Sequence, residues 1–318
     1  MNLLLALESF RRHMDNGRWL FQRGMEENGY ISAGAGMPKP GTDSVNVPEL
    51  VSSFRPKIVV FWPRYEWDHR EWGGTEVRPE HGYKHWECLF DRPDILRVAV
   101  LHDAGSARPE QKKWLEELKP HVYLVWYHPD SVAPLCPYVP KDKMLRTYHI
   151  LDSDALPPIK DRSGQCVLSG AHSPDVYPLR TRLLRSGSII RLGHPGYSQS
   201  GSTSNAFVAE LAKYRVAVCT ASSYKFALRK IFEATAAGCR VITDLPEYDV
   251  LPGINDNLVR ISPDANVTEV ESIVRREADN WSLDTQREYA ENARRRYHWR
   301  LESGRIATAL AYRSSQNV

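Results

Sequence analysis

The chain has 318 residues and a formal net charge of only +3, with 42% hydrophobic and 25% charged residues. This composition excludes extensive disorder, and the weak net charge excludes a strong whole-molecule attraction to nucleic acid. The length suits two α/β domains better than a single core. The five cysteines are scattered without close pairs, which argues against a disulfide framework or a zinc site.

Strand-like and helix-like segments alternate through the first half of the chain. Strands are predicted at residues 3–7, 57–62, 97–102 and 122–127, and helices at residues 16–27 and 109–118. Such alternation is typical of a mostly parallel, doubly wound sheet. The opening apolar run has no preceding basic residues and ends at Glu8, so it is too short for a secretory signal or a membrane span, and we expect a cytoplasmic protein.

A segment rich in proline and aspartate, DSDALPPIKD at residues 152–161, is the best linker candidate. We therefore predict an N-terminal Rossmann-like domain at residues 1–155 and a C-terminal one at residues 156–318. The second domain should begin with a strand at residue 166 and contain a helix at residues 268–281. A long helical stretch from residue 285 to near residue 312 should follow it.

The segment at residues 215–247 holds the most informative pattern. A β-branched strand (215–220), a turn of small polar residues (221–224), a helix that ends before Gly238 and a buried strand (240–243) form a βαβ unit. In such a unit the helix N-terminus lies at the carboxyl end of the preceding strand, where unpaired N–H groups favour a diphosphate. Lys225, Arg229 and Lys230 would add positive charge at that place.

Glu233 follows Arg229 by one helical turn. A carboxylate suits both hydrogens of a ribose diol, so a cation cluster followed by one carboxylate fits a nucleoside diphosphate. The alternative is an amphipathic helix whose apolar side is core and whose charges are solvated. The pattern alone gives the two interpretations similar weight.

The run LRKIFEATAAGCRVITD, residues 228–244, resembles the nucleotide-sugar-binding helix and strand of GT-B glycosyltransferases, especially the CgeB-like (spore maturation protein) group. Residues 167–170 and 177–180 are similar to the opening of that group's second domain. The resemblance covers residues 166–310. It implies an α/β fold of two Rossmann-like doubly wound domains facing a cleft, a last helix that crosses back to the first domain, and a nucleotide sugar, expected to be a UDP-sugar, as cosubstrate.

The resemblance also assigns roles within the second domain. It implies that Glu233 holds the ribose and that basic residues near Arg229 and Lys230 face the diphosphate. Many retaining GT-B enzymes carry two glutamates eight positions apart on this loop and helix. The first of these positions is Lys225 here. The stereochemical outcome therefore cannot be carried over.

Further donor-binding candidates follow two predicted strands. Gly170 lies among small residues that would let backbone N–H groups approach a phosphate. Arg180 would either bind the diphosphate or pair with Asp175. Thr220 and Ser222 end the strand before the motif helix, where their hydroxyls would either donate to phosphate or cap the helix.

Glycosyl transfer also needs a base for the acceptor hydroxyl. Ligands of open α/β sheets bind beyond the carboxyl ends of the strands, so residues that follow strands of the first domain are the candidates. Asp103, directly after the strand at residues 97–102, is the first choice as catalytic base. Glu8 is the second choice, and His102 is a further candidate. Their structural alternatives are to hold a loop or to pair with a nearby arginine.

The sequence thus predicts a glycosyltransferase of the hexosyltransferase type. Its acceptor would be a saccharide or a hydroxymethylated base of duplex DNA. The basic and aromatic segments at residues 64–86 and 287–300 permit DNA, whereas the neutral first half argues against it. The competing interpretation is a nucleotide-sugar-binding module without catalysis. A dinucleotide oxidoreductase is disfavoured, because neither strand-to-helix turn has the pattern G-x-G-x-x-G.

Asp152-Ser153-Asp154 has the D-x-D form found in metal-dependent sugar transferases of the other major fold. Its position in the predicted linker, far from the cation-rich motif, indicates a chance match. Lysine and arginine can stabilise a departing diphosphate, so we expect neither a metal nor a further cofactor to be required.

Overall fold

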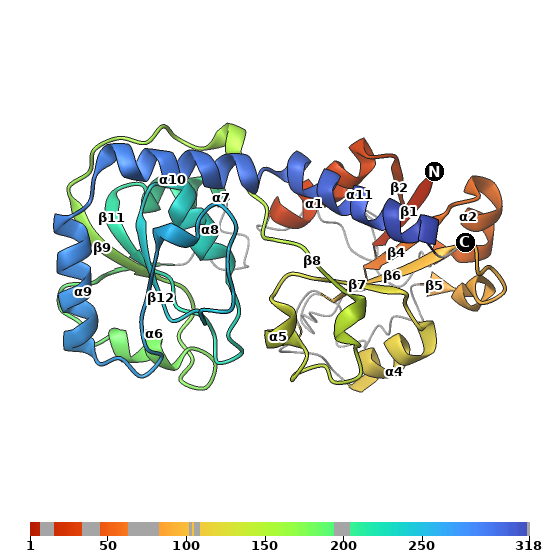
Figure 1. Cartoon of the computed structure of the whole chain (residues 1–318), viewed down its shortest axis with the longest axis horizontal. Coiled ribbons are helices and arrows are strands. Elements are labelled where there is room, and N and C mark those ends of the chain that lie inside the picture. The colour runs from red at the N-terminus through yellow and green to blue at the C-terminus, as the bar shows by residue number, and fades with distance from the viewer. Residues whose placement is uncertain are drawn as a thin grey trace. The chain divides into compact units, whose positions relative to one another are not determined.

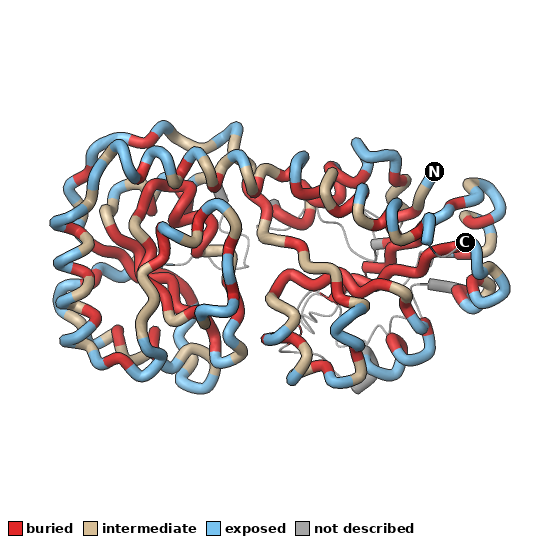
Figure 2. The backbone as a smooth tube through the Cα atoms, viewed as in Figure 1, coloured by how far each residue is buried: buried red, intermediate tan, exposed pale blue. Residues whose placement is uncertain are grey.

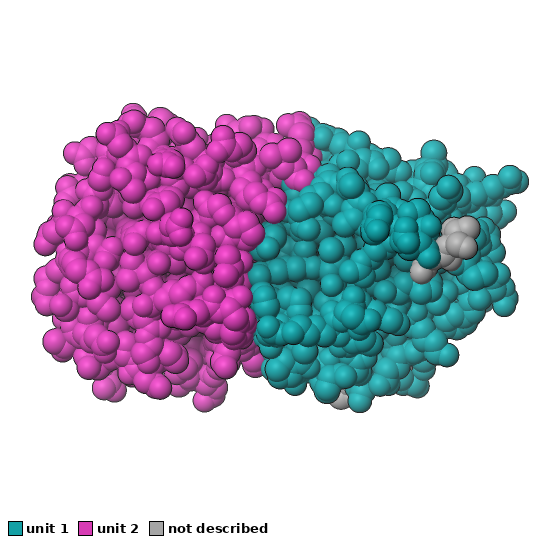
Figure 3. All heavy atoms as spheres, viewed as in Figure 1, with its two compact units in different colours: residues 1–13, 18–148, 302–318 teal, residues 14–17, 149–301 magenta. Residues whose placement is uncertain are grey.

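A computed structural model describes residues 1–6, 16–33, 45–62, 83–101, 104, 109–193 and 204–316. The chain divides into two compact units, coloured separately in Figure 3. Unit 1 contains residues 1–13, 18–148 and 302–318, and unit 2 contains residues 14–17 and 149–301. The main passage into unit 2 is therefore at His149, and the chain returns to unit 1 at Glu302.

Unit 1 is built on a six-stranded sheet in the order β2-β1-β4-β6-β7-β8, with every neighbouring pair parallel. The strands are β1 (Asn2–Ala6), β2 (Tyr30–Ala33), β4 (Ile58–Trp62), β6 (Leu96–Leu101), β7 (Val122–Val125) and β8 (Met144–Arg146). A small parallel pair joins β3 (Val45–Asn46) and β5 (Tyr83–Lys84). The helices are α1 (Asn16–Glu27), α2 (Val47–Phe54), η2 (Trp86–Leu89), α4 (Pro109–Leu118), α5 (Pro129–Val132) and η4 (Lys141–Lys143).

Helices cover both faces of this sheet, which is why its strands are continuous apolar runs. Every residue of β4 is buried, and so is every residue of β6. Because successive side chains of a strand point to opposite faces, Phe61 meets Trp114 of α4 at 5.9 Å between ring centroids while Trp62 meets Phe21 of α1 at 5.3 Å. Figure 2 shows the sheet as the buried interior of the unit.

Unit 2 is built on a five-stranded sheet in the order β10-β9-β11-β12-β13, again with every pair parallel. Its strands are β9 (Gly164–Ser169), β10 (Ile190–Leu192), β11 (Tyr214–Val218), β12 (Arg240–Thr243) and β13 (Leu258–Arg260). The helices are η5 (Ser153–Ala155), α6 (Pro178–Leu183), α7 (Ser204–Leu211), α8 (Arg229–Ala236), η6 (Asn255–Asn257), α9 (Val267–Asp279), α10 (Leu283–Arg296) and α11 (Trp299–Gln316), the last of which continues into unit 1.

Two layers of helices enclose the sheet of unit 2. Leu179 and Leu183 of α6 and Val270 and Val274 of α9 share one apolar cluster with β9, β11 and β12. On the other side of the sheet, α8 packs against α7 and α10, as Figure 1 shows. This is the doubly wound arrangement that the alternating pattern predicts, and it occurs once in each unit.

The predicted elements agree closely with the observed ones, with one correction. The helical stretch expected from residue 285 to near residue 312 is two helices, because α10 ends at Arg296 and α11 begins at Trp299. Leu151 causes the break: its N–H donates to the Tyr297 carbonyl and its carbonyl accepts from the Trp299 N–H, as in a parallel bridge. Neither group could bond in this way inside a continuous helix.

Candidate functional site

The candidate donor site lies at the carboxyl edge of the unit 2 sheet. From β9 the chain passes to β10 on one side and then to β11 on the other, so the strand order reverses between β9 and β11. Ligands of open α/β sheets bind beyond the strand ends at such a reversal. Gly170 directly follows β9, and Thr220 and Ser222 closely follow β11. Three predicted donor-binding residues are therefore at the expected place.

Gly170 lets two cationic side chains approach the end of β9. Its φ of 115° is a backbone conformation that residues with a side chain rarely adopt. A Cβ atom at this position would overlap the Lys230 ammonium and would lie 2.6 Å from Nη1 of Arg180. Lys230 also donates to the Ser169 carbonyl at 3.3 Å. The glycine, the lysine and the arginine, far apart in sequence, thus form one cluster.

Arg180 is a buried cation, only 1% exposed. Its Nε donates to Thr220 Oγ1 at 3.0 Å, and its two terminal nitrogens donate to the carbonyls of Thr220 and Ala171. Its guanidinium lies 4.0 Å from the ring centroid of Tyr177. The predicted alternative, a pair with Asp175, is wrong. Arg180 instead holds the ends of β9 and β11 together.

Helix α8 begins at Arg229 and places the predicted carboxylate in its second turn. Glu233 is 5% exposed, and its Oε1 accepts from Arg229 Nε at 2.8 Å. The N-cap residue, Leu228, has no side chain that could bond the first-turn N–H groups. The helix ends as predicted, with Gly238 at a φ of 84°.

The loop between β11 and α8 contains the remaining predicted residues. The side chains of Thr220 and Ser222 do not cap α8, so this alternative is wrong. Ser222 Oγ is buried without a hydrogen-bond partner among the described residues. Lys225 is exposed and has a φ of 60°, a conformation uncommon outside glycine.

Asp244 is a site residue that was not among the predicted candidates. It directly follows β12, and its Oδ1 accepts from the Ala221 N–H at 2.6 Å, which fixes the start of the β11–α8 loop. Burial raises the pKa of this carboxyl. The sequence could have indicated Asp244, because this residue stands at the end of an apolar strand, as Ser169 does at the end of β9.

The electrostatics of the cluster are dominated by the positive charge of the buried Arg180 and the half-buried Lys230. Burial, followed by repulsion from Arg180, lowers the pKa of Lys230 to about 7. Burial and the charge of Arg180 also lower the pKa of His172. Burial raises the pKa of the Cys219 thiol to about 12, so this cysteine contributes no negative charge near neutral pH.

The three predicted base candidates, Asp103, Glu8 and His102, lie outside the described residues. Asp154 is described: its Oδ2 lies 3.2 Å from His298 Nε2, and Ser153 Oγ donates to the Arg294 carbonyl. The D-x-D segment therefore contacts the C-terminal helices. Within the described ranges no group of three or more His, Cys, Asp or Glu side chains could hold a metal ion. None of the described helices is long and apolar enough to cross a membrane.

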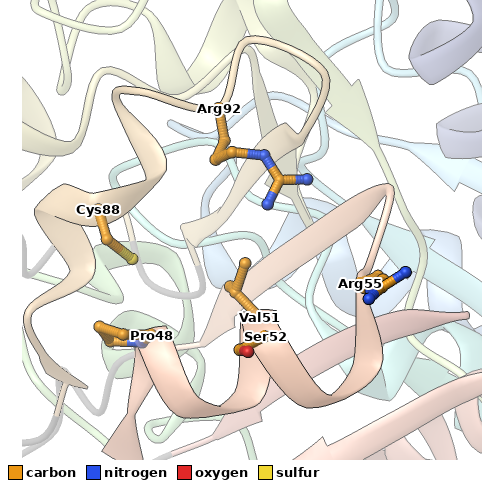
Figure 4. Close-up of a pocket in the computed structure, with 6 residues that line it drawn as sticks. All are labelled: Pro48, Val51, Ser52, Arg55, Cys88 and Arg92. Carbon is orange, nitrogen blue, oxygen red and sulfur yellow. The ribbon is translucent and has the colours of Figure 1, made fainter.

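Unit 1 contains a separate pocket of about 480 Å³, shown in Figure 4. It is lined by Pro48, Val51, Ser52, Arg55, Cys88 and Arg92. Arg92 is held by the Asp94 carboxylate through hydrogen bonds of 2.8 Å and 2.7 Å. None of the predicted site residues lines this pocket.

No protein-family model and no curated protein sequence matches the chain. Solved structures do match it. A glycosyltransferase from Rickettsia africae is 10% identical with a TM-score of 0.57, covering 98% of both chains. Anabaena HepE in complex with UDP and glucose is 12% identical with a TM-score of 0.54, covering 98% of this chain and all of that one.

A third match is sucrose-phosphate synthase from Thermosynechococcus elongatus, 10% identical with a TM-score of 0.56, covering 99% of this chain and all of that one. Identities this low establish the fold alone. The chain has the fold of GT-B glycosyltransferases, with two parallel sheets, each flanked by helices.

Proposed function

We propose that this chain is a glycosyltransferase that moves a sugar from a nucleotide-sugar donor to an acceptor hydroxyl. The observation behind this proposal is the cluster of Arg180, Lys230 and Gly170 at the point where the strand order of unit 2 reverses. A diphosphate would meet two cations there, as well as the uncapped start of α8 and the hydroxyl of Ser222. The fold is one on which known glycosyltransferases are built.

We propose a UDP-sugar as the donor and a hexosyl group as the transferred unit. The fold neighbour HepE forms a complex with UDP-glucose, which supports trying this donor first. Glu233 would accept from the ribose diol, while Lys225, Arg229 and Thr220 complete the proposed donor-binding set. Membership of the CgeB-like group rests on the motif at residues 228–244 and on the similarity of residues 167–170 and 177–180.

The proposed reaction breaks the bond between the sugar C1 and the diphosphate and forms a bond between C1 and the acceptor oxygen. A base removes the acceptor proton, and the departing diphosphate takes the bonding electrons. Arg180 and Lys230 would stabilise the charge that develops on this leaving group. Asp103 is our first candidate for the base, followed by Glu8 and His102.

The base can be identified by comparing two isosteric variants. Asp103→Asn should retain affinity for UDP-glucose and lose transfer by about 10²–10⁴-fold, because a general base acts only in the chemical step. Glu8→Gln is the matched comparison. Normal turnover in Asp103→Asn together with loss in Glu8→Gln would move the base to Glu8.

We propose a saccharide hydroxyl as the acceptor rather than duplex DNA. The basic segment at residues 287–300 is engaged within unit 2: Arg294 donates to the carbonyls of Ala236 and Pro157, and Arg295 donates to Asn292. Arg300 lies over the Trp299 ring. Arg294 is therefore held by internal carbonyls, whereas Arg295 and Arg300 are exposed. The net charge of only +3 is what favours a saccharide over a polyanion.

The proposal is tested by incubating the protein with nucleotide sugars and mixed acceptors, duplex DNA with hydroxymethylated bases included, and detecting products by mass spectrometry. We expect a hexosyl product and free UDP, with activity retained in the presence of a chelator because Arg180 and Lys230 supply the positive charge. If chelation abolishes transfer and a divalent metal restores it, the metal-free mechanism is wrong. Tight donor binding without any product favours the alternative, a non-catalytic nucleotide-sugar-binding module.

A further inference from the structure

The two cations at the end of β9 lie close together, and among the described residues carboxylates act on them through charge alone: Asp244 on Arg180 and Glu233 on Lys230. Arg180 bonds a hydroxyl and two backbone carbonyls, and Lys230 bonds one backbone carbonyl. Both crowd the position that a Gly170 side chain would occupy, so their positive groups are close neighbours. Among the described residues neither cation has a carboxylate as a hydrogen-bond partner. A second positive charge on the half-buried Lys230, beside the buried Arg180, is therefore costly until an anion arrives.

The described groups that act on Lys230 come from several elements, and Asp244 after β12 acts on its neighbour Arg180. Helix α6 contributes Arg180, and the loop after β9 contributes His172, whose own pKa Lys230 helps to lower. Cys219, directly after β11, also lies near Lys230. Burial raises the pKa of its thiol, so the thiol stays protonated near neutral pH. Within α8 itself the one nearby carboxylate, Glu233, is bonded to Arg229 at 2.8 Å.

We propose that this site takes up a proton when the diphosphate of the donor binds, and that Lys230 is the group that accepts it. The proposal rests on the proposed function, because it assumes that the diphosphate lies against Arg180 and Lys230. The proton moves from solvent to the Lys230 amine, which becomes an ammonium, and no other covalent bond changes. Donor binding would then be coupled to pH through a contact residue of the diphosphate.

The expected sign follows from the pKa of Lys230. Burial and the charge of Arg180 lower this pKa to about 7, so most Lys230 side chains should be neutral at pH 8. A bound diphosphate favours the ammonium and raises the pKa. Uptake should therefore approach one proton at pH 8 and be small at pH 6. Affinity for the donor should be constant below the free pKa and fall about tenfold per pH unit between the free and the bound pKa.

Calorimetry of UDP-glucose binding at pH 8, in HEPES and in Tris, tests the proposal, because the two buffers differ in the heat of releasing a proton. UDP-glucose is a suitable probe since its diphosphate is esterified at both ends and has no phosphate group that titrates near neutrality. We expect uptake of about 0.5–1 proton at pH 8. Equal binding heats in the two buffers would overturn the proposal and leave the proposed function standing.

A direct titration separates this inference from the choice of donor. The Lys230 side-chain resonance, assigned with Lys230→Met, should titrate near 7 in the protein without UDP-glucose. A Lys230 value near 10 overturns the proposal whatever the donor is. Absence of UDP-glucose binding at pH 8 and at pH 6, with Lys230 titrating near 7, would instead count against the proposed donor and remove the basis for the coupling.

Two further variants locate the proton. Lys230→Arg keeps a positive charge that is not lost at pH 8, so it should bind UDP-glucose without proton uptake. His172→Gln should retain the uptake at pH 8, because the lowered pKa of His172 leaves it far from titrating there. Undiminished uptake in Lys230→Arg, or its loss in His172→Gln, would assign the proton to another group.

Discussion

At the residue scale, Glu233 bonds Arg229 and is also proposed to accept from the ribose diol. Its Oε1 accepts from Arg229, and its side chain is nearly buried. An arginine bonded to a carboxylate in this way orients it and favours its charged form, which is the form that accepts from a diol. The ion pair is therefore compatible with ribose binding, and the two interpretations of the motif helix are not exclusive.

Glu233→Gln should weaken UDP-glucose binding by about 1.5–3 kcal/mol, the scale of a hydrogen bond to a charged group. Glu277→Gln is the matched control, since Glu277 also lies in unit 2 and pairs with Arg240 at 3.1 Å and with Arg276 at 2.8 Å. Calorimetry measures both variants. The same affinity in both would remove Glu233 from the donor site.

Gly170→Ala should lower both stability and donor affinity. The backbone at a φ of 115° penalises any side chain, at a cost of about 1–3 kcal/mol, and the added methyl group would displace the Lys230 ammonium. Gly187→Ala is the control, because a Cβ there meets nothing within 4 Å. Thermal unfolding should show lower stability, and calorimetry lower UDP-glucose affinity, in Gly170→Ala only. Normal donor binding by Gly170→Ala would contradict the placement of the diphosphate.

The sequence was informative about single residues wherever a local motif fixes them. The cations and the carboxylate of α8 follow from one contiguous run, and the i,i+4 spacing of Arg229 and Glu233 is itself a pairing pattern. The partners of Arg180 could not be predicted, because Thr220 lies forty residues away and is brought near only by the parallel pairing of β9 with β11. The roles of Asp103, Glu8 and His102 stay predictions.

At the element scale, α8 depends on the glycine that ends it. Gly238 has a φ of 84°, and an added Cβ would lie 3.0 Å from both Arg162 Nη2 and Ile159 Cγ2. Gly253 has a similar φ of 78°, but its added Cβ would meet nothing closer than 3.8 Å. The two positions therefore differ in crowding and share the backbone strain.

Gly253→Ala should destabilise unit 2 by about 1–2 kcal/mol through backbone strain alone. Gly238→Ala should cost more than this, because Arg162 and Ile159 must also move. Urea unfolding of both variants gives the comparison. Equal losses would show that the contacts beyond Gly238 adjust freely, contrary to close packing at the end of α8.

Elements with long, regular patterns were predicted best. The bounds of α1 and α4 agree with the prediction, because each is an amphipathic run with clear ends. Short elements such as β2, β8 and α2 were missed, since a run of three to eight residues carries little periodic signal. The break between α10 and α11 could not be predicted either, because it depends on Leu151, a distant residue that pairs with the backbone there.

At the scale of the whole molecule, each unit has its own parallel sheet and its own core. The predicted boundary near residue 155 stays a prediction. The C-terminal part of α11 belongs to unit 1: Ile306 and Leu310 are fully buried, and the buried Glu302 accepts from Thr147 Oγ1 and the Tyr148 N–H at 3.0 Å each. Residues 302–318 thus complete unit 1, most of which is formed by residues 18–148.

Removing residues 302–318 should therefore unfold unit 1 selectively. Losing the buried Ile306 and Leu310 side chains costs about 1.5–3 kcal/mol each. Losing Glu302 also leaves Thr147 Oγ1 and the Tyr148 N–H without their acceptor. The summed cost is comparable with the whole stability of a domain, about 5–15 kcal/mol. Hydrogen exchange should show lost amide protection in β4, β6 and β7 and retained protection in β9, β11 and β12. Tyr312→Ala, at a side chain 67% exposed, should leave both units protected. Loss of protection in both sheets to the same extent would mean that the two units unfold as one cooperative body, and the division of the chain into separately stable units would be wrong.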